Sequence, residues 1–382
     1  MKIAILTQPL HTNYGGILQA FALQKVLEKM GHKALVVDLP NRKTRIGKYK
    51  RTVIRIIKKY ILGQKDSSPI FRERPTSEEE KKIAQHTNRF IQENISTTCE
   101  IPFVENLDLL KKYHFDAYIV GSDQVWRPQY SPGIYAFFLN FLGNDKITKR
   151  IAYAASFGVD FWEFNKKQTQ QCKILAQKFD SISVREDSGV KLCEKYLGVK
   201  AIQLADPTML LSKDEYLSLI SNYEIPNRKE SIMVYILDKT SEKDLIVQRV
   251  IQHFNLPTNI VLPSKSFSKE SRKFINECVF PPVPYWIQGF EDASFIITDS
   301  FHGTVFSIIF NKPFIVIGNK ERGLSRFISL LSMFGLENRL IASVDEFDSE
   351  FLDKPIDFSI VNKIKDEQQS KSYDFLYSLL KK

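Results

Sequence analysis

Residues 294–318 read SFIITDSFHGTVFSIIFNKPFIVIG, in which two apolar runs flank a short polar break. The first run, SFIIT, and the last, NKPFIVIG, are typical of buried strands. Between them, GTVFSIIFN begins with a glycine and is long enough for a helix of about two to three turns. Strand, turn, helix and strand in this order predict a parallel sheet with a crossover helix.

The polar break contains Asp299, Ser300 and His302, and it lies between the predicted strand and the predicted helix. Ligands bind α/β sheets at the carboxyl ends of strands, and the free N–H groups of a helix start favour anions. His302 can exchange a proton near neutral pH, and Gly303 beside it leaves space for a ligand. We therefore expect a site here that includes His302, Ser300 and Gly303, with a purely structural histidine as the alternative.

The whole chain has 382 residues, which exceeds one ordinary hydrophobic core and predicts two domains. Its 43% hydrophobic and 12% aromatic content argues against extended disorder. No apolar run approaches the ~20 residues of a membrane span, and the amino terminus reads as a strand rather than a signal peptide. Four scattered cysteines without a C-x-x-C pair indicate a cytoplasmic location and argue against a zinc site.

Strand and helix patterns alternate in both halves. The strands predicted in the first half are KIAILT, KALVVDL, FDAYIV, RIAYAASFG and SISVRE, and SIMVYILD opens the second half. Asp206-Pro207 separates the halves, because proline blocks helix continuation. The predicted architecture is α/β, with two doubly wound Rossmann-like domains facing each other across a cleft. We assign 1–205 to the N-terminal domain, with a basic insertion at 41–94, 206–358 to the C-terminal domain, and 359–382 to a helix that packs back on the first half.

The net charge of +10 suggests an anionic partner, and the excess is concentrated in residues 42–61, where apolar residues also recur at helical spacing. One interpretation is peripheral contact with an anionic membrane surface, at the cytoplasmic face, where a lipid-linked substrate is held. The other is a surface helix whose apolar face lies in the core. The run lacks interleaved aromatic residues, so nucleic-acid binding is not indicated.

Further candidate residues lie in turns after predicted strands. In the turn NYGG, Asn13, Tyr14, Gly15 and Gly16 allow the backbone to approach a ligand, or they merely connect strand to helix. No G-x-G-x-x-G or Walker sequence supports a nucleotide cofactor.

A second turn, GSDQVWRP, places Ser122, Asp123, Trp126 and Arg127 at the end of the strand AYIV. Asp123 could take a proton from a sugar hydroxyl, and Trp126 could stack on a sugar face. The alternatives are an aspartate that caps the next helix and a tryptophan in the core.

Arginines follow two other predicted strands. Arg185 in SVRE can bind a carboxylate or phosphate with two parallel N–H bonds, or it pairs with a neighbouring acid. In GNKERGLSRF, Arg322, Ser325 and Arg326 form a second phosphate candidate, with simple helix capping as the alternative.

In the order and spacing of its motifs, the chain resembles the polysaccharide pyruvyl transferase family from end to end. The matching stretches are NYGGILQAFALQKVL, VGSDQVW, SVRED, LADPTMLL, TDSFHGT with NKPFI, and ERGLSRF. The resemblance implies a GT-B glycosyltransferase fold. It also implies transfer of pyruvate from phosphoenolpyruvate (PEP) to two hydroxyls of a sugar, giving a cyclic ketal on a capsule or exopolysaccharide glycan.

The resemblance also assigns roles. Arg185 would hold an anionic end of PEP, and His302 would protonate the PEP methylene as general acid, with no metal or nicotinamide required. Two departures stand out: Ser300 occupies a position where many members have arginine, and the glycine turn near Gly16 has no acid. We expect Arg322 or Arg326 to supply the missing charge, with weaker PEP binding than in relatives, or none, as the alternative. Asp123 is expected to act as the base.

Two other functions fit the same architecture. A glycosyltransferase using a nucleotide sugar would need a carboxylate for the ribose, for which Glu291 and Asp292 are candidates. A non-catalytic relative would bind glycans without turning over PEP.

Overall fold

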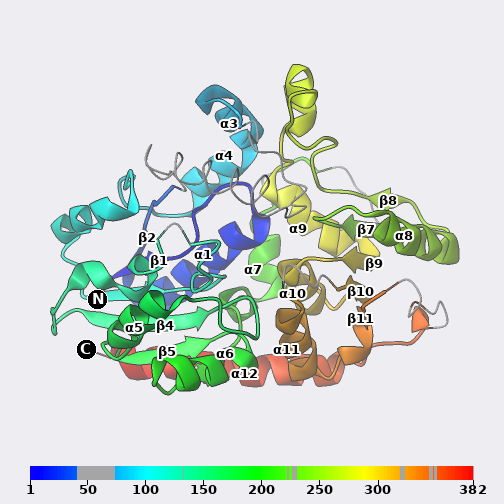
Figure 1. Ribbon diagram of the computed structural model, residues 1–382. Helices are drawn as coiled ribbons and strands as arrows, with labels where there is room; N and C mark the ends of the chain where they lie inside the picture. Colours follow the sequence, from blue (N-terminus) through cyan, green and yellow to red (C-terminus); the bar gives the residue numbers. More distant parts are fainter. Residues whose placement is uncertain are drawn as a thin grey trace, which may run out of the picture.

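The computed structural model describes residues 1–40, 74–131, 133–221, 223–225, 230–318, 323–343, 347 and 351–381. The basic segment 42–61 and Arg322 therefore lie outside the described residues. The described end of the predicted insertion forms helices α3 (Ser77–Ile83) and α4 (Gln85–Asn94). Figure 1 shows two groups of strands side by side, one formed by each half of the chain.

The N-terminal half contains a six-stranded sheet in the order β2-β1-β3-β4-β5-β6, in which all neighbouring strands are parallel. The strands of this sheet are β1 (Lys2–Leu6), β2 (Lys33–Val36), β3 (Ala117–Val120), β4 (Lys149–Ala155), β5 (Ser181–Val184) and β6 (Ile202–Gln203). Its helices are α1 (Tyr14–Lys29), η2 (Val104–Tyr113), η3 (Ala136–Phe138), η4 (Asn140–Leu142), α5 (Lys166–Ala176), α6 (Asp187–Leu192) and η5 (Cys193–Leu197).

The C-terminal half contains a five-stranded parallel sheet in the order β11-β10-β9-β7-β8. Its strands are β7 (Ser231–Tyr235), β8 (Thr258–Asn259), β9 (Ala293–Thr298), β10 (Phe314–Ile317) and β11 (Leu340–Ile341). The helices from the boundary onward are η6 (Pro207–Leu210), α7 (Lys213–Leu217), α8 (Ser241–Phe254), η7 (Ser271–Cys278), α9 (Val283–Asp292), α10 (Phe301–Ile309), α11 (Leu324–Phe334), η8 (Glu337–Arg339) and α12 (Phe358–Leu380). The predicted fold class, two parallel α/β sheets, is confirmed.

The stretch that opens this section folds as β9, α10 and β10, and each residue of its polar break has a defined place. The side-chain oxygen of Ser300 accepts a hydrogen bond from the N–H of Gly303 at 3.3 Å, so Ser300 is the N-cap of α10. The Asp299 carboxylate turns the other way and accepts hydrogen bonds from the loop after β7. His302 is therefore left in the first turn of α10, at the carboxyl end of β9.

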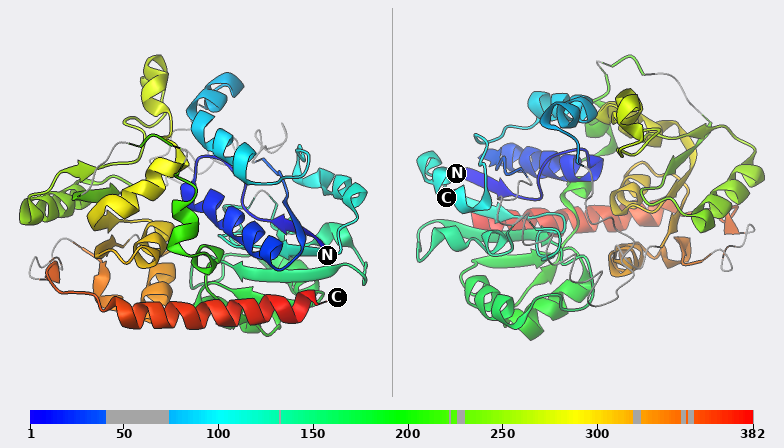
Figure 2. Two further views of the ribbon diagram at one scale, coloured as in Figure 1. Left: turned by 180° about the vertical axis from the view of Figure 1, so that it is seen from behind. Right: turned by 45° about the horizontal axis from the view of Figure 1, so that its top comes forward.

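One continuous hydrophobic cluster joins the two halves. Tyr14 at the start of α1 packs against Trp286 of α9, with ring centroids 5.7 Å apart. Helix α12 begins in the C-terminal half and runs beneath both halves, as Figure 2 shows, and its Phe375 contacts Tyr153 of β4. These contacts bury apolar surface from both halves together, which stabilises their relative position.

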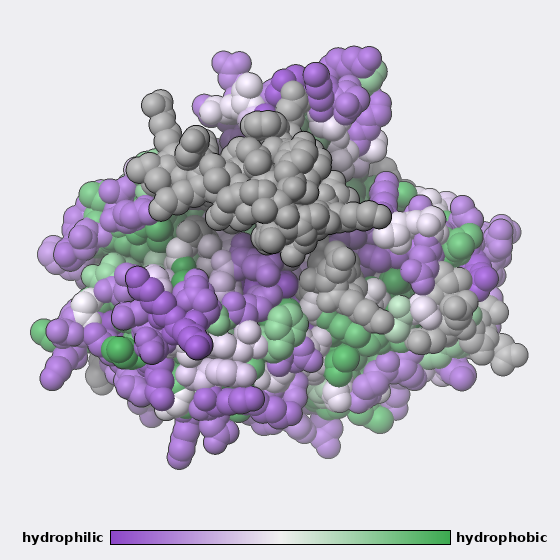
Figure 3. All heavy atoms as spheres, in the orientation of Figure 1, coloured by the Kyte–Doolittle hydropathy of each residue, from purple (hydrophilic) through white to green (hydrophobic). Residues whose placement is uncertain are grey.

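The face seen in Figure 3 is mostly hydrophilic, and its larger hydrophobic patch lies over β10, β11 and α11. Among the residues that the structure describes, no helix has the length and apolar character needed to cross a membrane.

Candidate functional site

The carboxylate of Asp206, between β6 and η6, is the centre of a buried polar cluster. Its Oδ2 atom lies 3.0 Å from Nη1 of Arg185 and 3.5 Å from Nε2 of His302. The hydroxyl of Ser122 also donates to Oδ2, at 3.0 Å. The other oxygen, Oδ1, accepts from the N–H and the hydroxyl of Thr208 at 3.1 and 2.8 Å. The carboxylate is therefore fixed from several sides.

This cluster brings together the two residues predicted to bind PEP. Arg185 follows β5 in the N-terminal half, and His302 lies in α10 of the C-terminal half. Burial alone would raise the pKa of Asp206, but His302, Arg185 and the Thr208 N–H hold it well below its ordinary value. Asp206 thus stays ionised and is the common counter-charge for a guanidinium and an imidazole from opposite halves.

Arg185 is surrounded by three acids. Besides Asp206, its Nε atom lies 3.2 Å from Glu186 and its Nη2 atom lies 3.9 Å from Asp123. Burial would lower the pKa of Arg185, yet these carboxylates raise it above its ordinary value. Nη2 is buried and makes no hydrogen bond to any residue that the structure describes, so this donor is available to a ligand.

The guanidinium of Arg185 also stacks on Phe301, with 4.0 Å between Cζ and the ring centroid. Arg326 of α11 lies near the same ring, with 5.9 Å between its Cζ and the ring centroid, and its side chain is buried. Burial, together with the nearby charge of Arg185, lowers the pKa of Arg326 to about 10. The two guanidiniums therefore gather around Phe301, while Ser325 beside Arg326 has a buried hydroxyl without a described partner.

The imidazole of His302 packs against the first turn of α1. A Cβ atom built on Gly15 would lie 2.2 Å from Nδ1 of His302, so only glycine allows this approach. Within the described part of the chain, the side chain of Asn13 caps none of the N–H groups at the start of α1. The predicted turn NYGG thus reaches the site through the backbone of Gly15.

Three sequence interpretations need correction. Trp126 is fully buried, donates its indole N–H to the carbonyl of Phe137 and stacks on Phe138 at 4.7 Å, so its ring cannot receive a sugar. Tyr14 is also buried and donates its hydroxyl to a backbone carbonyl, at 2.7 Å. Arg127 forms a buried two-pronged ion pair with Glu163, which leaves it a structural role.

Sequence reasoning missed Asp206 and Glu186 as site residues. Asp206 was interpreted as a domain boundary, although an aspartate before a proline also caps short helices, as it does here. The signal that could have found both acids is the expectation that a buried arginine is accompanied by carboxylates. Glu186 was named only as an ion-pair alternative for Arg185, and the structure contains that ion pair.

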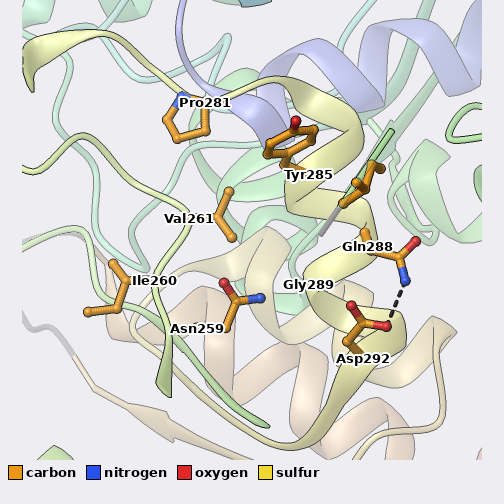
Figure 4. A pocket seen from close by; sticks show the side chains of 9 residues that line it. Asn259, Ile260, Val261, Pro281, Tyr285, Gln288, Gly289 and Asp292 are labelled. Atoms are coloured by element: carbon orange, nitrogen blue, oxygen red, sulfur yellow. Dashed lines mark hydrogen bonds between the residues drawn. The ribbon is translucent and has the colours of Figure 1, made fainter. Parts of the chain in front are cut away.

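A separate pocket lies between α9 and the residues after β8, away from this cluster (Figure 4). Asn259, Tyr285, Gln288 and Asp292 contribute its polar atoms, and Gln288 donates to Asp292 at 2.7 Å. Its volume of about 80 Å³ is well below that of ordinary ligand sites. Glu291 faces elsewhere and pairs with Lys213 at 2.7 Å, so the two acids do not form a joint ribose site.

Solved structures of similar fold cover nearly the whole chain. UDP-GlcNAc 2-epimerase from Neisseria meningitidis, bound to UDP-GlcNAc, has a TM-score of 0.51 at 10% identity and covers 100% of this chain and 99% of its own. S. aureus MnaA, in a co-structure with UDP, has a TM-score of 0.51 at 14% identity, with 99% and 97% covered. The N-terminal domain of Candida albicans trehalose-6-phosphate phosphatase has a TM-score of 0.50 at 12% identity, with 99% and 98% covered. These similarities show the fold, which is GT-B as predicted.

Comparison with curated proteins gave no match. The family model described as polysaccharide pyruvyl transferase, in contrast, matches residues 13–321. The matched range includes every residue of the Asp206 cluster, from the glycine turn of α1 to His302. The chain therefore belongs to the polysaccharide pyruvyl transferase family.

Proposed function

We propose that this protein transfers pyruvate from PEP to two hydroxyls of a sugar, forming a cyclic ketal on a cell-surface or exopolysaccharide glycan. Family membership supports the reaction class. The observation that carries the proposal is the meeting of Arg185 and His302 on one oxygen of Asp206, at 3.0 and 3.5 Å. A small anion that contacts one of these two side chains is then within reach of the other.

Charge and backbone geometry support an anionic donor. The unused Nη2 of Arg185 and the guanidinium of Arg326 offer donors suited to carboxylate or phosphate. The starts of α1 and α11 have no side-chain cap in the described structure, so their N–H groups and dipoles can favour negative charge. In α10, by contrast, the N–H of Gly303 already donates a hydrogen bond to the side-chain oxygen of Ser300. Arg326 thus takes the role that arginine would have at position 300.

The reaction begins when His302 gives a proton to the PEP methylene carbon. The C=C electron pair forms the new C–H bond, and the central carbon becomes electrophilic. A sugar hydroxyl adds to this carbon and gives its proton to Asp123, which lies 3.9 Å from Arg185. Phosphate then leaves with the C–O electron pair, and the second hydroxyl closes the ketal. Asp123 passes the first hydroxyl proton to the departing phosphate, and the proton of the second hydroxyl restores His302.

In this scheme neither a metal nor a nicotinamide cofactor takes part, and the acceptor is a saccharide that can be lipid-linked. Positive charge from Arg185 and Arg326 stabilises the departing phosphate. The acceptor is held on the side of Asp123, in the N-terminal half.

The direct test is release of inorganic phosphate from PEP in the presence of defined oligosaccharides and lipid-linked sugars. We expect release only with an acceptor, and formation of a pyruvylated sugar by mass spectrometry. His302→Ala should abolish release while the thermal unfolding temperature stays within a few degrees of the wild type. Stabilisation by nucleotide sugars but not by PEP would instead indicate a glycosyltransferase, and glycan binding without turnover would indicate a binding protein.

A further inference from the structure

We propose that Asp206 holds a proton on Nε2 of His302, so that Nδ1 is the ring nitrogen that delivers the proton to the substrate. The assignment of the two nitrogens follows from geometry alone. Its catalytic meaning rests on the proposed pyruvyl transfer. Asp206 is thus a positioning residue, which acts through the imidazole and does not touch PEP.

The two nitrogens of His302 have different surroundings. Nε2 is buried, and Oδ2 of Asp206, 3.5 Å away, is the acceptor it faces among the described residues. The carboxylate cannot turn away, because Ser122 and Thr208 hold both of its oxygens. A carboxylate beside one ring nitrogen favours the tautomer with the proton on that nitrogen.

Nδ1 lies on the opposite side, beside the first turn of α1. The position that a Cβ of Gly15 would fill is 2.2 Å from Nδ1, and no charged side chain of α1 intervenes in the described structure. The charged groups nearest the imidazole are therefore Asp206 and, through it, Arg185. The N–H groups at the start of α1 are not capped by the side chain of Asn13, so the start of this helix can favour an anionic donor.

This arrangement gives each ring nitrogen one task. The imidazolium is stabilised by the Asp206 carboxylate, and it loses its Nδ1 proton to the PEP methylene carbon. The neutral ring that remains carries its proton on Nε2, which is the tautomer that already faces Asp206. A hydroxyl proton then returns to Nδ1, and the ring need not rotate during the cycle.

The first test uses the wild-type protein without any substrate. Nitrogen NMR of protein labelled with ¹⁵N-histidine reports which ring nitrogen carries the proton, and comparison with His302→Gln assigns the signal. We expect neutral His302 to carry its proton on Nε2. A proton on Nδ1, with a bare Nε2 facing the carboxylate, would overturn the proposal, whatever reaction the protein catalyses.

The second test removes the charge of Asp206. In Asp206→Asn the neutral His302 ring should carry its proton on Nε2 to a smaller extent than in the wild type, because the carboxylate that favours this tautomer is gone. If PEP turnover is present, kcat should fall by about 100-fold.

The matched control is Asp299→Asn, which removes a second buried carboxylate that contacts neither Arg185 nor His302. It should lower stability and leave the His302 tautomer unchanged. A folded Asp206→Asn protein with the tautomer distribution of the wild type would contradict the role of Asp206. If Asp206→Asn does not fold, the tautomer of His302 in the wild-type protein is the observation that supports or contradicts the proposal. Absence of PEP turnover in the wild type contradicts only the proposed function.

Discussion

Asp206 and Asp299 are both buried aspartates beside the end of a strand, but they serve different purposes. Asp299 accepts hydrogen bonds from the N–H groups of Leu237 and Asp238 and pairs with Lys243 at 2.6 Å. All of its partners belong to the C-terminal half. Asp206 instead contacts Arg185 of one half and His302 of the other.

The difference shows why burial of a carboxylate does not by itself identify a functional site. Every oxygen of Asp299 is matched by donors that hold the loop after β7 against the end of β9, which is what a structural acid requires. Around Asp206, Nη2 of Arg185 is still a buried nitrogen atom without a described hydrogen bond. An unused donor next to a satisfied acid is the feature that separates the second cluster from the first.

The largest effect expected from this comparison is on stability at Asp299. Lys243→Met should lower the free energy of unfolding by about 3–5 kcal/mol, because it leaves a buried carboxylate without its counter-charge. Urea denaturation followed by circular dichroism measures the change. Lys265→Met is the control, since its partner Glu277 is 41% exposed and such pairs contribute about 0–1 kcal/mol. Equal losses in the two variants would contradict a structural role for the Asp299 pair.

The next effect concerns activity, at two neighbouring glycines of α1. Gly15→Ala should lower PEP turnover by about 100-fold, because the new methyl group would displace the imidazole of His302. At Gly16 the atom that a Cβ would meet is Nδ2 of the exposed Asn13, at 3.0 Å, and this side chain can move. Gly16→Ala should therefore have the smaller effect on kcat.

Both glycine variants need a measurement of folding alongside turnover, because a clash can also lower stability. Thermal unfolding of each purified protein supplies it. A Gly16→Ala enzyme more impaired than Gly15→Ala, at comparable stability, would show that the imidazole does not rest on α1 in solution.

These positions also show what the sequence could predict. The apolar runs around residues 294–318 determined β9, α10 and β10, since strand and helix periodicity are local properties. Arg185 and His302 were found because each follows a buried strand, and the parallel topology places such positions at the same edge. The meeting of residues from two different sheets depends on how the halves pack, which no local pattern contains.

The same limit explains the misassigned residues. Trp126 follows a strand just as Arg185 does, but its ring turns into the core of the N-terminal half, where Phe138 and Phe137 contact it. The ring of Tyr14 is likewise buried, in the core shared by both halves, where it packs against Trp286. Asp206 was missed for the opposite reason: its partners are 21 and 96 residues away in the sequence, so only the tertiary structure shows that it has any.

A smaller effect is expected in the pH dependence of stability. The pKa of Asp206 is lower in the folded protein than the value of about 4 in an unfolded chain. Its contribution to stability is therefore present above about pH 4 and is lost as the pH falls further. Asp206→Asn should make the free energy of unfolding less steeply dependent on pH between about pH 4 and pH 2. Urea denaturation across this range tests it, and an unchanged slope would mean that the carboxylate is not held ionised by its partners.

The smallest effect separates capping from ligand binding at position 300. Ser300→Ala removes the acceptor for the Gly303 N–H and should cost about 1 kcal/mol of stability. If capping is the role of Ser300, Ser300→Thr should recover most of that loss, because threonine can also cap a helix. A KM for PEP that rises more than tenfold in Ser300→Ala without loss of stability would instead place the hydroxyl on the substrate. The guanidinium of Arg326 would then not be sufficient by itself to hold PEP.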